Sequence, residues 1–312
     1  MEEKRESGPV ENSKLSDLIS KIGDVELEES KDLTKYSTMR LVAIGDLITV
    51  KSLAALKQLL PKLKDNKINY RVIGWGANQL LPKTSVIPYL MLNFPFEKSY
   101  LDEVRNEYIL PASVSLSVLS SHAVKNGLKG WEVFTGIPAS LGGAIFMNAG
   151  TNLGEICNIV NEVYLIDSKG HERTVIVDKN SFSYRKNHFL DEGDVITGAK
   201  LTHHGQSPDI TTQIKEYLAL RNRTQPLKES TCGCIFKNDK KSNKVCPAGM
   251  FIDIIGMKGF TNKRIQISPK HANFMVNTGG ANFEDICETI AIVQKELKLQ
   301  YGVDFETEVK LN

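Results

Sequence analysis

An uncharged stretch from Val133 to Leu153 constrains the fold of this chain more than any other feature. It is long enough to cross a bilayer as a helix, which takes about 20 residues. Its glycines, Pro138 and two asparagines would leave many backbone groups without partners in lipid, which excludes a membrane span. The stretch is instead predicted to be a buried glycine-rich loop with short segments of regular structure.

The composition is that of an ordinary globular protein. The 312 residues include 39 Lys plus Arg and 37 Asp plus Glu, and the net charge of +2 argues against a protein built around nucleic acid or an anionic membrane. The length suits two domains or one elaborate fold, at roughly 100 to 200 residues per domain. Residues 1–14 mix both charges without an apolar core, unlike a secretory signal, so we expect a cytosolic protein.

The cysteines form an odd set, which favours free thiols over a disulfide framework: Cys157, Cys232, Cys234, Cys246 and Cys287. Three of them, between positions 232 and 246, are close enough in sequence to suggest a metal site. They lack a paired CxxC motif and a nearby pair of histidines, so we expect no bound metal.

The first half of the chain alternates helical and strand-like patterns. Residues 1–33 are polar and weakly periodic, and they are predicted to be a mobile or loosely docked tail. After Ser52 the apolar residues recur as on a helix, and a short strand at 71–73 follows and ends in glycines. Another strand and helix are expected between residues 108 and 128, with Gly127 as the helix stop.

Strands dominate the middle of the chain, and helices return towards its end. Residues 161–177 are predicted to form a hairpin, and residues 194–204 another strand. Helices are expected over residues 209–223 and between Asn282 and Gly302. The alternation of apolar and polar residues over 304–311 predicts a final strand.

Two glycine-rich loops have the composition of a nucleotide-binding site. The loop GWGAN at 74–78 follows a strand, and its glycines would let backbone N–H groups approach a pyrophosphate. A tight turn is the more common explanation of such a motif when it stands alone. The second loop, GIPASLGGAIFMNAG at 136–150, carries no charge and suits a close-packed wall against a large planar cofactor.

Six motifs of this chain together resemble those of a known family, the bacterial UDP-N-acetylenolpyruvoylglucosamine reductases, which make UDP-N-acetylmuramate for peptidoglycan. The motifs occur in the family's order and span most of the chain: GWGAN at 74–78, GIPASLGGAIFMNAG at 136–150, FSYR at 182–185, GCIFKN at 233–238, KHANFMVNTGGA at 270–281 and ETEVKL at 306–311. The short interval between FSYR and GCIFKN is similar to the shorter subclass of the family, which lacks an extra substrate-capping insertion.

The resemblance implies an α+β protein with an FAD-binding fold of the vanillyl-alcohol-oxidase type and a C-terminal α+β substrate domain. Residues 34–203 would form the FAD-binding domain in two subdomains, and residues 204–312 the substrate-binding domain, whose terminal strand returns to the active site. NADPH would reduce FAD, and hydride would pass to the vinyl carbon of UDP-N-acetyl-3-O-(1-carboxyvinyl)-glucosamine. We therefore expect a monomer whose partners are a UDP-sugar and NADPH.

The resemblance also assigns three catalytic residues. Arg185 would hold the enolpyruvyl carboxylate and the developing enolate in a fork of N–H donors that lysine cannot imitate. Cys234 stands where many members carry Ser, and a thiol with a pKa of about 8.5 is the easier proton donor near neutral pH. Glu308 would polarise the substrate. Without the motifs, Arg185 and Glu308 would be interpreted as surface residues and Cys234 as a structural cysteine.

The same motifs provide candidate binding residues. Tyr184, Lys237 and Asn238 would bind the UDP-sugar, because a diphosphate requires a cation and polar donors. Ala77 stands where the family usually has Ser, which removes a possible hydroxyl contact to FAD and keeps the backbone cradle. The candidate FAD-binding residues are Gly74, Gly76, Ala77, Asn78, Gly136, Ile137, Gly142, Gly143 and Asn148.

Two other functions suit the same fold. One is an FAD-dependent oxidase that uses oxygen, whose members often attach FAD through a His or Cys, and no matched attachment residue is evident here. The other is a non-catalytic protein that binds FAD or a UDP-sugar. The presence of Arg185, Cys234 and Glu308 together argues against a binding protein without turnover.

Overall fold

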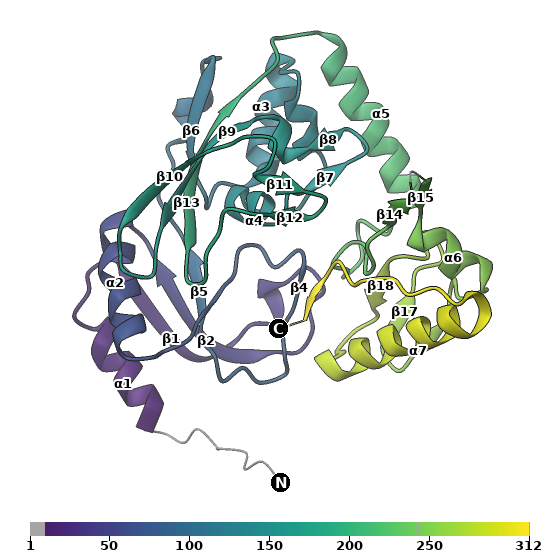
Figure 1. Cartoon of the computed structure of the whole chain (residues 1–312), viewed down its shortest axis with the longest axis horizontal. Coiled ribbons are helices and arrows are strands. Elements are labelled where there is room, and N and C mark those ends of the chain that lie inside the picture. The colour runs from purple at the N-terminus through teal and green to yellow at the C-terminus, as the bar shows by residue number, and fades with distance from the viewer. Residues whose placement is uncertain (1–9, 243, 312) are drawn as a thin grey trace. The chain divides into compact units, whose positions relative to one another are not determined.

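The computed structural model of the chain describes residues 10–242 and 244–311 and divides into two compact units (Figure 1). Each unit has its own apolar core. None of the helices in the described residues combines the length and the apolar character that a bilayer crossing needs. The first unit consists of Met1–Lys31, Gly45–Gly74 and Val86–Thr211, and the second of Asp32–Ile44, Trp75–Ser85 and Thr212–Asn312.

The early part of the first unit is a sheet with helices packed on it. Its strands lie in the order β1 (Val25–Asp32), β2 (Ile44–Val50), β5 (Tyr89–Leu92) and β3 (Arg71–Val72), and β5 is parallel to both of its neighbours. Parallel strands need a crossover, which α2 (Leu53–Asp65) supplies. Ser52 begins this helix because its Oγ accepts a hydrogen bond from the N–H of Ala55 at 3.2 Å.

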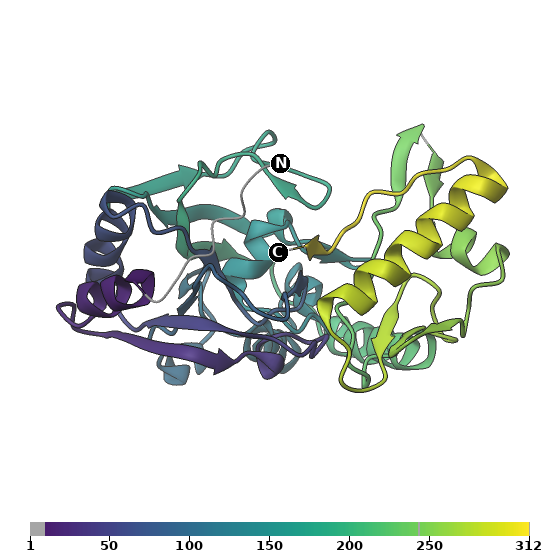
Figure 2. The ribbon, with the colours of Figure 1, turned by 90° about the horizontal axis from the view of Figure 1, so that it is seen from below.

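The N-terminal segment is not the polar tail that the sequence predicted. Residues 1–9 lie outside the described residues, but α1 (Val10–Ile19) and β1 follow them. Leu15, Ile19 and Ile22 are buried in the same apolar cluster as the leucines of α2, and Figure 2 shows the two helices beside one another. The prediction is wrong because a few apolar residues on one helical face are enough to bury a helix, whereas the average composition stays polar.

An antiparallel sheet forms the rest of the first unit. Its order is β10 (Glu172–Ile176), β9 (Val160–Ile166), β13 (Val195–Thr202) and β6 (Glu107–Pro111), which confirms the predicted hairpin and the strand after it (Figure 1). The helix α3 (Leu116–Asn126) ends at Gly127, whose φ of 62° is left-handed, as predicted. Trp131 is buried beside α3 and α4 (Leu141–Phe146), and its Nε1 donates to the carbonyl of Thr202 at 2.8 Å.

Two short hairpins extend this unit. The strands β7 (Gly150–Thr151) and β8 (Gly154–Glu155) form one of them. The strands β11 (Phe182–Ser183) and β12 (Lys186–Asn187) form the other, so Tyr184 and Arg185 make up its two-residue turn.

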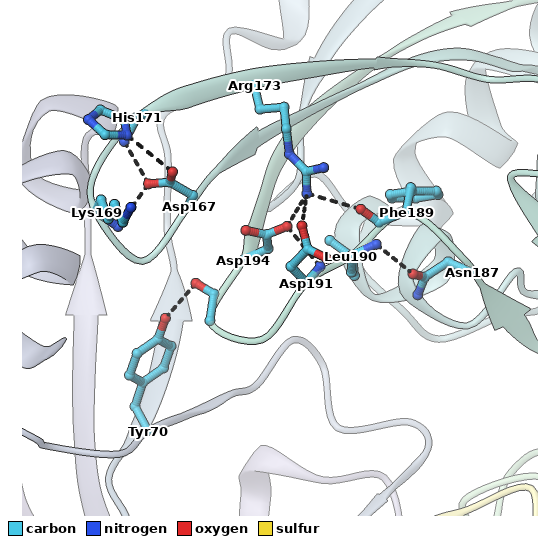
Figure 3. A network of polar contacts seen from close by, with 11 residues as sticks. Tyr70, Asp167, Lys169, His171, Arg173, Asn187, Phe189, Leu190, Asp191 and Asp194 are labelled. Atoms are coloured by element: carbon cyan, nitrogen blue, oxygen red, sulfur yellow. Dashed lines mark hydrogen bonds and ion pairs between the residues drawn. The ribbon is translucent and has the colours of Figure 1, made fainter.

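A polar network fixes the chain that follows β12 (Figure 3). Arg173 of β10 donates from Nη2 to the carbonyl of Phe189 at 3.0 Å and to the buried carboxylate of Asp194. The Tyr70 hydroxyl donates to the carbonyl of Gly193 at 3.0 Å, and burial raises the pKa of Tyr70 to about 12, so it keeps the proton that it donates. The loop is therefore held at both ends, by Arg173 of β10 and by Tyr70, which precedes β3.

The second unit has an apolar core between short strands and the longest helix. That helix, α7 (Phe283–Tyr301), confirms the prediction: Asn282 and Asp285 form a capping box at its start, and Gly302 ends it with a φ of 66°. The predicted helix over 209–223 is also confirmed, as α5. The remaining elements are α5 (Asp209–Thr224), α6 (Ala248–Ile254), β16 (Thr261–Asn262), β17 (Ile265–Ile267), β18 (Met275–Asn277), β14 (Asp239–Ser242) and β15 (Lys244–Cys246).

The C-terminal segment does not form the continuous strand that its alternation predicted. Thr307 makes a single bridge to Phe236, and only β19 (Lys310–Leu311) forms a ladder, parallel to β4 (Gln79–Leu80). The apolar residues Phe305 and Val309 are buried as the pattern requires. The strand is interrupted because the backbone is hydrogen-bonded to residues 235–237 up to Glu308 and to Asn78 from Lys310 onwards.

The second unit also contains two early segments that the predicted domain boundaries placed with residues 34–203. Within it, the N–H of Val42 donates to the carbonyl of Ala281 at 2.9 Å, and Asn277 Nδ2 donates to the carbonyl of Met39 at 3.0 Å. Asn277 and Met39 are 238 residues apart in the sequence. No local pattern marks such an assignment, so a linear division of the sequence does not find it.

The first unit should lose stability in mild acid through His122. Burial lowers the pKa of this histidine, whose Nε2 lies 3.0 Å from the Tyr108 hydroxyl. The unfolded chain therefore binds the proton at a higher pH than the folded chain, so stability should fall as the pH drops from about 6.5 towards the lower pKa of the folded state. Urea unfolding followed by Trp131 fluorescence in a Trp75→Phe background measures this.

His122→Gln, which cannot titrate, should flatten that pH dependence. His171→Gln is the matched control, since this side chain is largely exposed, with its Nδ1 3.2 Å from Asp167 Oδ2. Trp131 is the appropriate reporter because burial also lowers the pKa of His271, which belongs to the second unit. An unchanged slope in His122→Gln would contradict the assignment.

Candidate active site

The two glycine loops predicted from the sequence meet within the first unit at Gly74 and Ser140. A Cβ on Gly74 would lie 2.7 Å from Ser140 Oγ, so a larger residue here would displace this hydroxyl. Ser140 in turn begins α4, because its Oγ accepts a hydrogen bond from the N–H of Gly143 at 3.3 Å. Gly142 packs on Ala112, where an added Cβ would lie 2.8 Å from the alanine methyl group. Gly74 and Gly142 are therefore needed for packing.

The accessible edge of the second loop consists of three other predicted residues. Gly136 and Gly143 are exposed, and Ile137 is half-buried. Gly136 has a φ of 71°, in the left-handed region that favours glycine. A ligand of the first unit can reach the loop along this edge.

The rest of the first loop belongs to the second unit and lies against residues 36–38. A Cβ on Gly76, whose φ is 60°, would lie 2.1 Å from the carbonyl oxygen of Tyr36. Ser37 Oγ and Thr38 Oγ1 are buried, and neither has a hydrogen-bond partner among the described residues. A buried hydroxyl without a partner costs about 1–3 kcal/mol, so two of them beside a glycine turn indicate a polar ligand here.

Asn78, a predicted FAD-binding residue, anchors the C-terminal segment. Its Nδ2 donates to the backbone carbonyl of Glu308 at 3.0 Å, and its own carbonyl accepts from the N–H of Lys310 at 2.9 Å. The half-buried Ala77 precedes it and presents no hydroxyl. Within the second unit, the first glycine loop is thus hydrogen-bonded to Glu308, the glutamate that the sequence motifs predicted to be catalytic.

Arg185 occupies the tip of the β11–β12 hairpin in the first unit. Its φ of 59° is left-handed, which is uncommon for a residue with a side chain. Its Nη2 donates to the carbonyl of Gly150 at 2.9 Å, and its guanidinium carbon lies 5.3 Å from the centre of the Tyr184 ring. The half-buried Tyr184 thus lies beside Arg185, in agreement with their shared motif.

Cys234 lies between two backbone segments of the second unit. It bridges Phe274 on one side. The next residue, Ile235, donates its N–H to the carbonyl of Asn273 at 2.9 Å, and its carbonyl accepts from the N–H of Glu308 at 2.7 Å. Cys234 and Glu308, predicted to be catalytic, are therefore on directly hydrogen-bonded segments.

Asn273 is a positioning residue that sequence reasoning missed. It is buried, its Oδ1 accepts from the N–H of Phe236 at 2.9 Å, and its Nδ2 donates to the carbonyl of Phe236 at 2.8 Å. These contacts hold the segment after Cys234 in place. The available sequence signal was a polar residue at a position of an alternating stretch where the pattern predicts an apolar, buried side chain.

Charged groups near the Cys232–Cys234 segment include Arg221 and Glu308. Burial, with smaller contributions from the charges of Cys234 and Glu308, raises the pKa of Cys232 to about 12, so Cys232 stays a neutral thiol. Arg221 of α5 is held by Gln225, with 2.8 Å between Nε and Oε1, and burial lowers its pKa while a charge on Cys234 raises it. The guanidinium therefore lies close enough to Cys234 to interact with a charge on it.

Two of the predicted substrate-binding residues have protein partners. Lys237 Nζ pairs with Glu306 Oε1 at 2.6 Å, and the carboxylate of Glu306 is largely exposed. Asn238 Oδ1 accepts from the N–H of Ala248 at 3.1 Å, at the start of α6. Such an exposed ion pair contributes about 0–1 kcal/mol, so Lys237 can exchange its partner for a phosphate at little cost.

The predicted site residues are shared between the units. Gly74, Gly136, Ile137, Gly142, Gly143, Asn148, Tyr184 and Arg185 belong to the first unit, and Gly76, Ala77, Asn78, Cys234, Lys237, Asn238 and Glu308 to the second. All five cysteines are free thiols. No group of His, Cys, Asp or Glu that could hold a metal ion occurs among the described residues.

Family comparisons define the class of protein. Residues 46–175 match the model of an FAD-binding domain, and residues 225–312 match the C-terminal domain of UDP-N-acetylenolpyruvoylglucosamine reductase. The first match includes strands of both sheets of the first unit but not β1 or β13, and the second covers the segments that carry Cys234 and Glu308. The fold is therefore that of an FAD-binding oxidoreductase.

The chain belongs to the UDP-N-acetylenolpyruvoylglucosamine reductase family. It is 33% identical over 282 residues to the reductase of Chlamydia pneumoniae, which covers 89% of this chain and 90% of the relative. It is 30% identical over 302 residues to that of Syntrophobacter fumaroxidans, which covers 94% and 86%. The crystal structure of the Thermus caldophilus reductase has a TM-score of 0.75 to this chain at 30% identity and covers 92% of this chain and 98% of that one. The predicted fold class is confirmed.

Gly76→Ala should destabilise the second unit strongly. The new methyl group would overlap the Tyr36 carbonyl and force the loop to move, in addition to the cost of a left-handed alanine. We expect a loss of about 3 kcal/mol in the free energy of unfolding, measured by urea denaturation. Gly259→Ala is the matched control, because Gly259 has a φ of 78° with nothing within 4 Å of the added Cβ, and it should lose only about 1 kcal/mol. Equal losses would show that the close approach is unimportant.

Proposed function

We propose that this chain reduces UDP-N-acetyl-3-O-(1-carboxyvinyl)-glucosamine to UDP-N-acetylmuramate with NADPH, in peptidoglycan precursor synthesis. The observation that carries the proposal is the backbone hydrogen bond between Glu308 and Ile235, which joins a carboxylate to the segment of a proton donor, Cys234. Family membership over most of the chain supports the same reaction.

The residues present fit FAD as the cofactor. The unpartnered hydroxyls of Ser37 and Thr38 lie beside Gly76, where they would donate to the polar part of the dinucleotide. The exposed edge from Gly136 to Gly143 would lie against the cofactor through backbone groups. Bound FAD would supply the hydride chemistry, taking hydride from NADPH and passing it to the vinyl carbon.

The protein's own groups would manage the charge that this transfer creates. Arg185 would bind the enolpyruvyl carboxylate and stabilise negative charge on the carbon beside it. Cys234 would donate a proton from its thiol to that carbon, and Arg221 would stabilise the thiolate that remains. Glu308 would orient the substrate from the segment hydrogen-bonded to Ile235.

Substrate binding would fall mainly to the second unit. Lys237 would leave its exposed partner Glu306 to bind the diphosphate, with Asn238 and Tyr184 as polar partners of the UDP-sugar. One chain supplies every residue assigned to the reaction, which supports a monomer as the functional form. NADPH and nucleotide-linked sugars are cytosolic metabolites, which supports a cytosolic location.

The purified protein should be yellow and should release intact FAD on heating or acid treatment, because glycine loops and hydroxyl groups bind without a covalent bond. Its flavin absorbance should be bleached by NADPH under anaerobic conditions and restored by the enolpyruvyl substrate. Colourless protein that FAD cannot reconstitute would refute the cofactor assignment. Restoration of the absorbance by oxygen alone, with no effect of the enolpyruvyl substrate, would favour an oxidase.

Cys234→Ala should leave bleaching by NADPH near its normal rate and slow restoration of the absorbance by the substrate by about 10² to 10⁴, as expected for loss of a general acid. Cys234→Ser should retain far more activity, because a hydroxyl keeps the donor geometry. Anaerobic stopped-flow absorbance separates the two steps. Cys287→Ala is the control, since this half-buried thiol lies on α7, and it should behave as the unmodified protein.

The relative rates of the substrate step in Cys234→Ala and Cys234→Ser decide the role of the thiol. A cysteine that only fills space tolerates alanine at least as well as serine, because alanine buries no hydroxyl. If the alanine variant were as fast as the serine variant, the proton would have to come from another group.

A further inference from the structure

We propose that Asn148 positions Arg185 for the reaction by locking the turn that carries it, and that it does not bind FAD. The proposal rests on the role of Arg185 in the proposed function. It assigns to Asn148 a task different from the cofactor contact that its motif suggested.

The Arg185 turn needs an external constraint. A two-residue hairpin turn leaves Arg185 in a left-handed conformation, with a φ of 59°, that a residue with a side chain adopts only when its surroundings hold it there. The guanidinium contacts the segment after α4: Nη2 lies 2.9 Å from the carbonyl oxygen of Gly150, and Nη1 lies 3.4 Å from that of Asn148. The position of the guanidinium therefore follows the position of residues 148–150.

Asn148 connects this segment to the turn through its side chain. Its Nδ2 donates to the carbonyl of Ser183, one residue before the turn, at 3.1 Å and to Glu155 Oε2 at 2.9 Å. Its Oδ1 accepts from the N–H of Cys157 at 3.2 Å. The residue is fully buried, and both N–H groups of the amide are used within the first unit.

Asparagine is the side chain that these contacts require. An amide of this length offers two donors and one acceptor, whereas aspartate has no donor, alanine has neither, and glutamine is one methylene longer. Asn148 itself has a φ of 45°, and asparagine tolerates the left-handed region better than most residues. A buried amide with both donors engaged cannot also donate to a cofactor, so its effect on the reaction must pass through the Arg185 turn.

The test is a double-mutant cycle of Asn148→Asp and Arg185→Lys, measured on the substrate step in single turnover and on FAD affinity by fluorescence. Asn148→Asp should slow the substrate step by about tenfold or more with FAD affinity within about twofold of normal, because it places a carboxylate against Glu155 and the Ser183 carbonyl. The double variant should be no slower than Arg185→Lys alone, since two residues that act through one group are not additive.

A rescue variant and a control complete the design. Adding Glu155→Gln to Asn148→Asp should recover part of the rate, because the new amide can donate to the new carboxylate. Asn152→Asp is the control: this exposed residue lies on the same β7–β8 turn, and the added charge there should change neither measurement. If Asn148→Asp alone fails to fold, the rescued pair takes its place in the cycle.

The outcomes separate this inference from the proposed function. Multiplied effects in the double variant, or a fall in FAD affinity that parallels the fall in rate, would overturn the positioning role and restore a cofactor contact. An Arg185→Lys variant with an unchanged substrate step would instead refute the proposed role of Arg185. A slow Arg185→Lys variant with a normal Asn148→Asp variant would refute only the inference.

Discussion

The candidate chemistry depends on the backbone pairing of the C-terminal segment. The N–H of Glu308 donates to the carbonyl of Ile235, and that of Lys310 donates to the carbonyl of Asn78, so one short segment is bound to both the Cys234 segment and the first glycine loop. These backbone hydrogen bonds fix the register of the segment, because a slip of one position would turn its side chains to the other face. The orientation of Glu308 relative to these two partners within the second unit is set in this way.

Sequence patterns predicted the elements whose signals are local. The helix α7 was predicted at both ends because its cap at Asn282 and its stop at Gly302 act within a few residues, and the β9–β10 hairpin likewise carries its own turn. α1 was missed because its burial depends on α2 and not on its own composition. The membership of residues 32–44 in the second unit depends on partners such as Asn277, which no window of sequence includes.

The sequence motifs provided the candidate residues of the site, but they did not predict the contacts that those residues make. The motifs that this chain shares with its family pointed to both glycine loops, Arg185, Cys234 and Glu308 as candidates. Motifs do not say what an asparagine contacts: Asn78 and Asn148 were both assigned to FAD, yet one binds the backbone of Glu308 and the other the Ser183 carbonyl. Asn273 escaped notice because its partner, Phe236, is 37 residues away.

The discontinuity of the second unit has a consequence for biosynthesis. The antiparallel sheet of the first unit is formed by residues 107–202, so its partners leave the ribosome together and can pair during translation. Residues 32–44 and 78–80 emerge early, but Asn78 must wait for Glu308, 230 residues later. Over that interval the early segments are synthesised without their partners, and their apolar residues, such as Met39 and Leu41, remain exposed to chaperones and to other nascent chains.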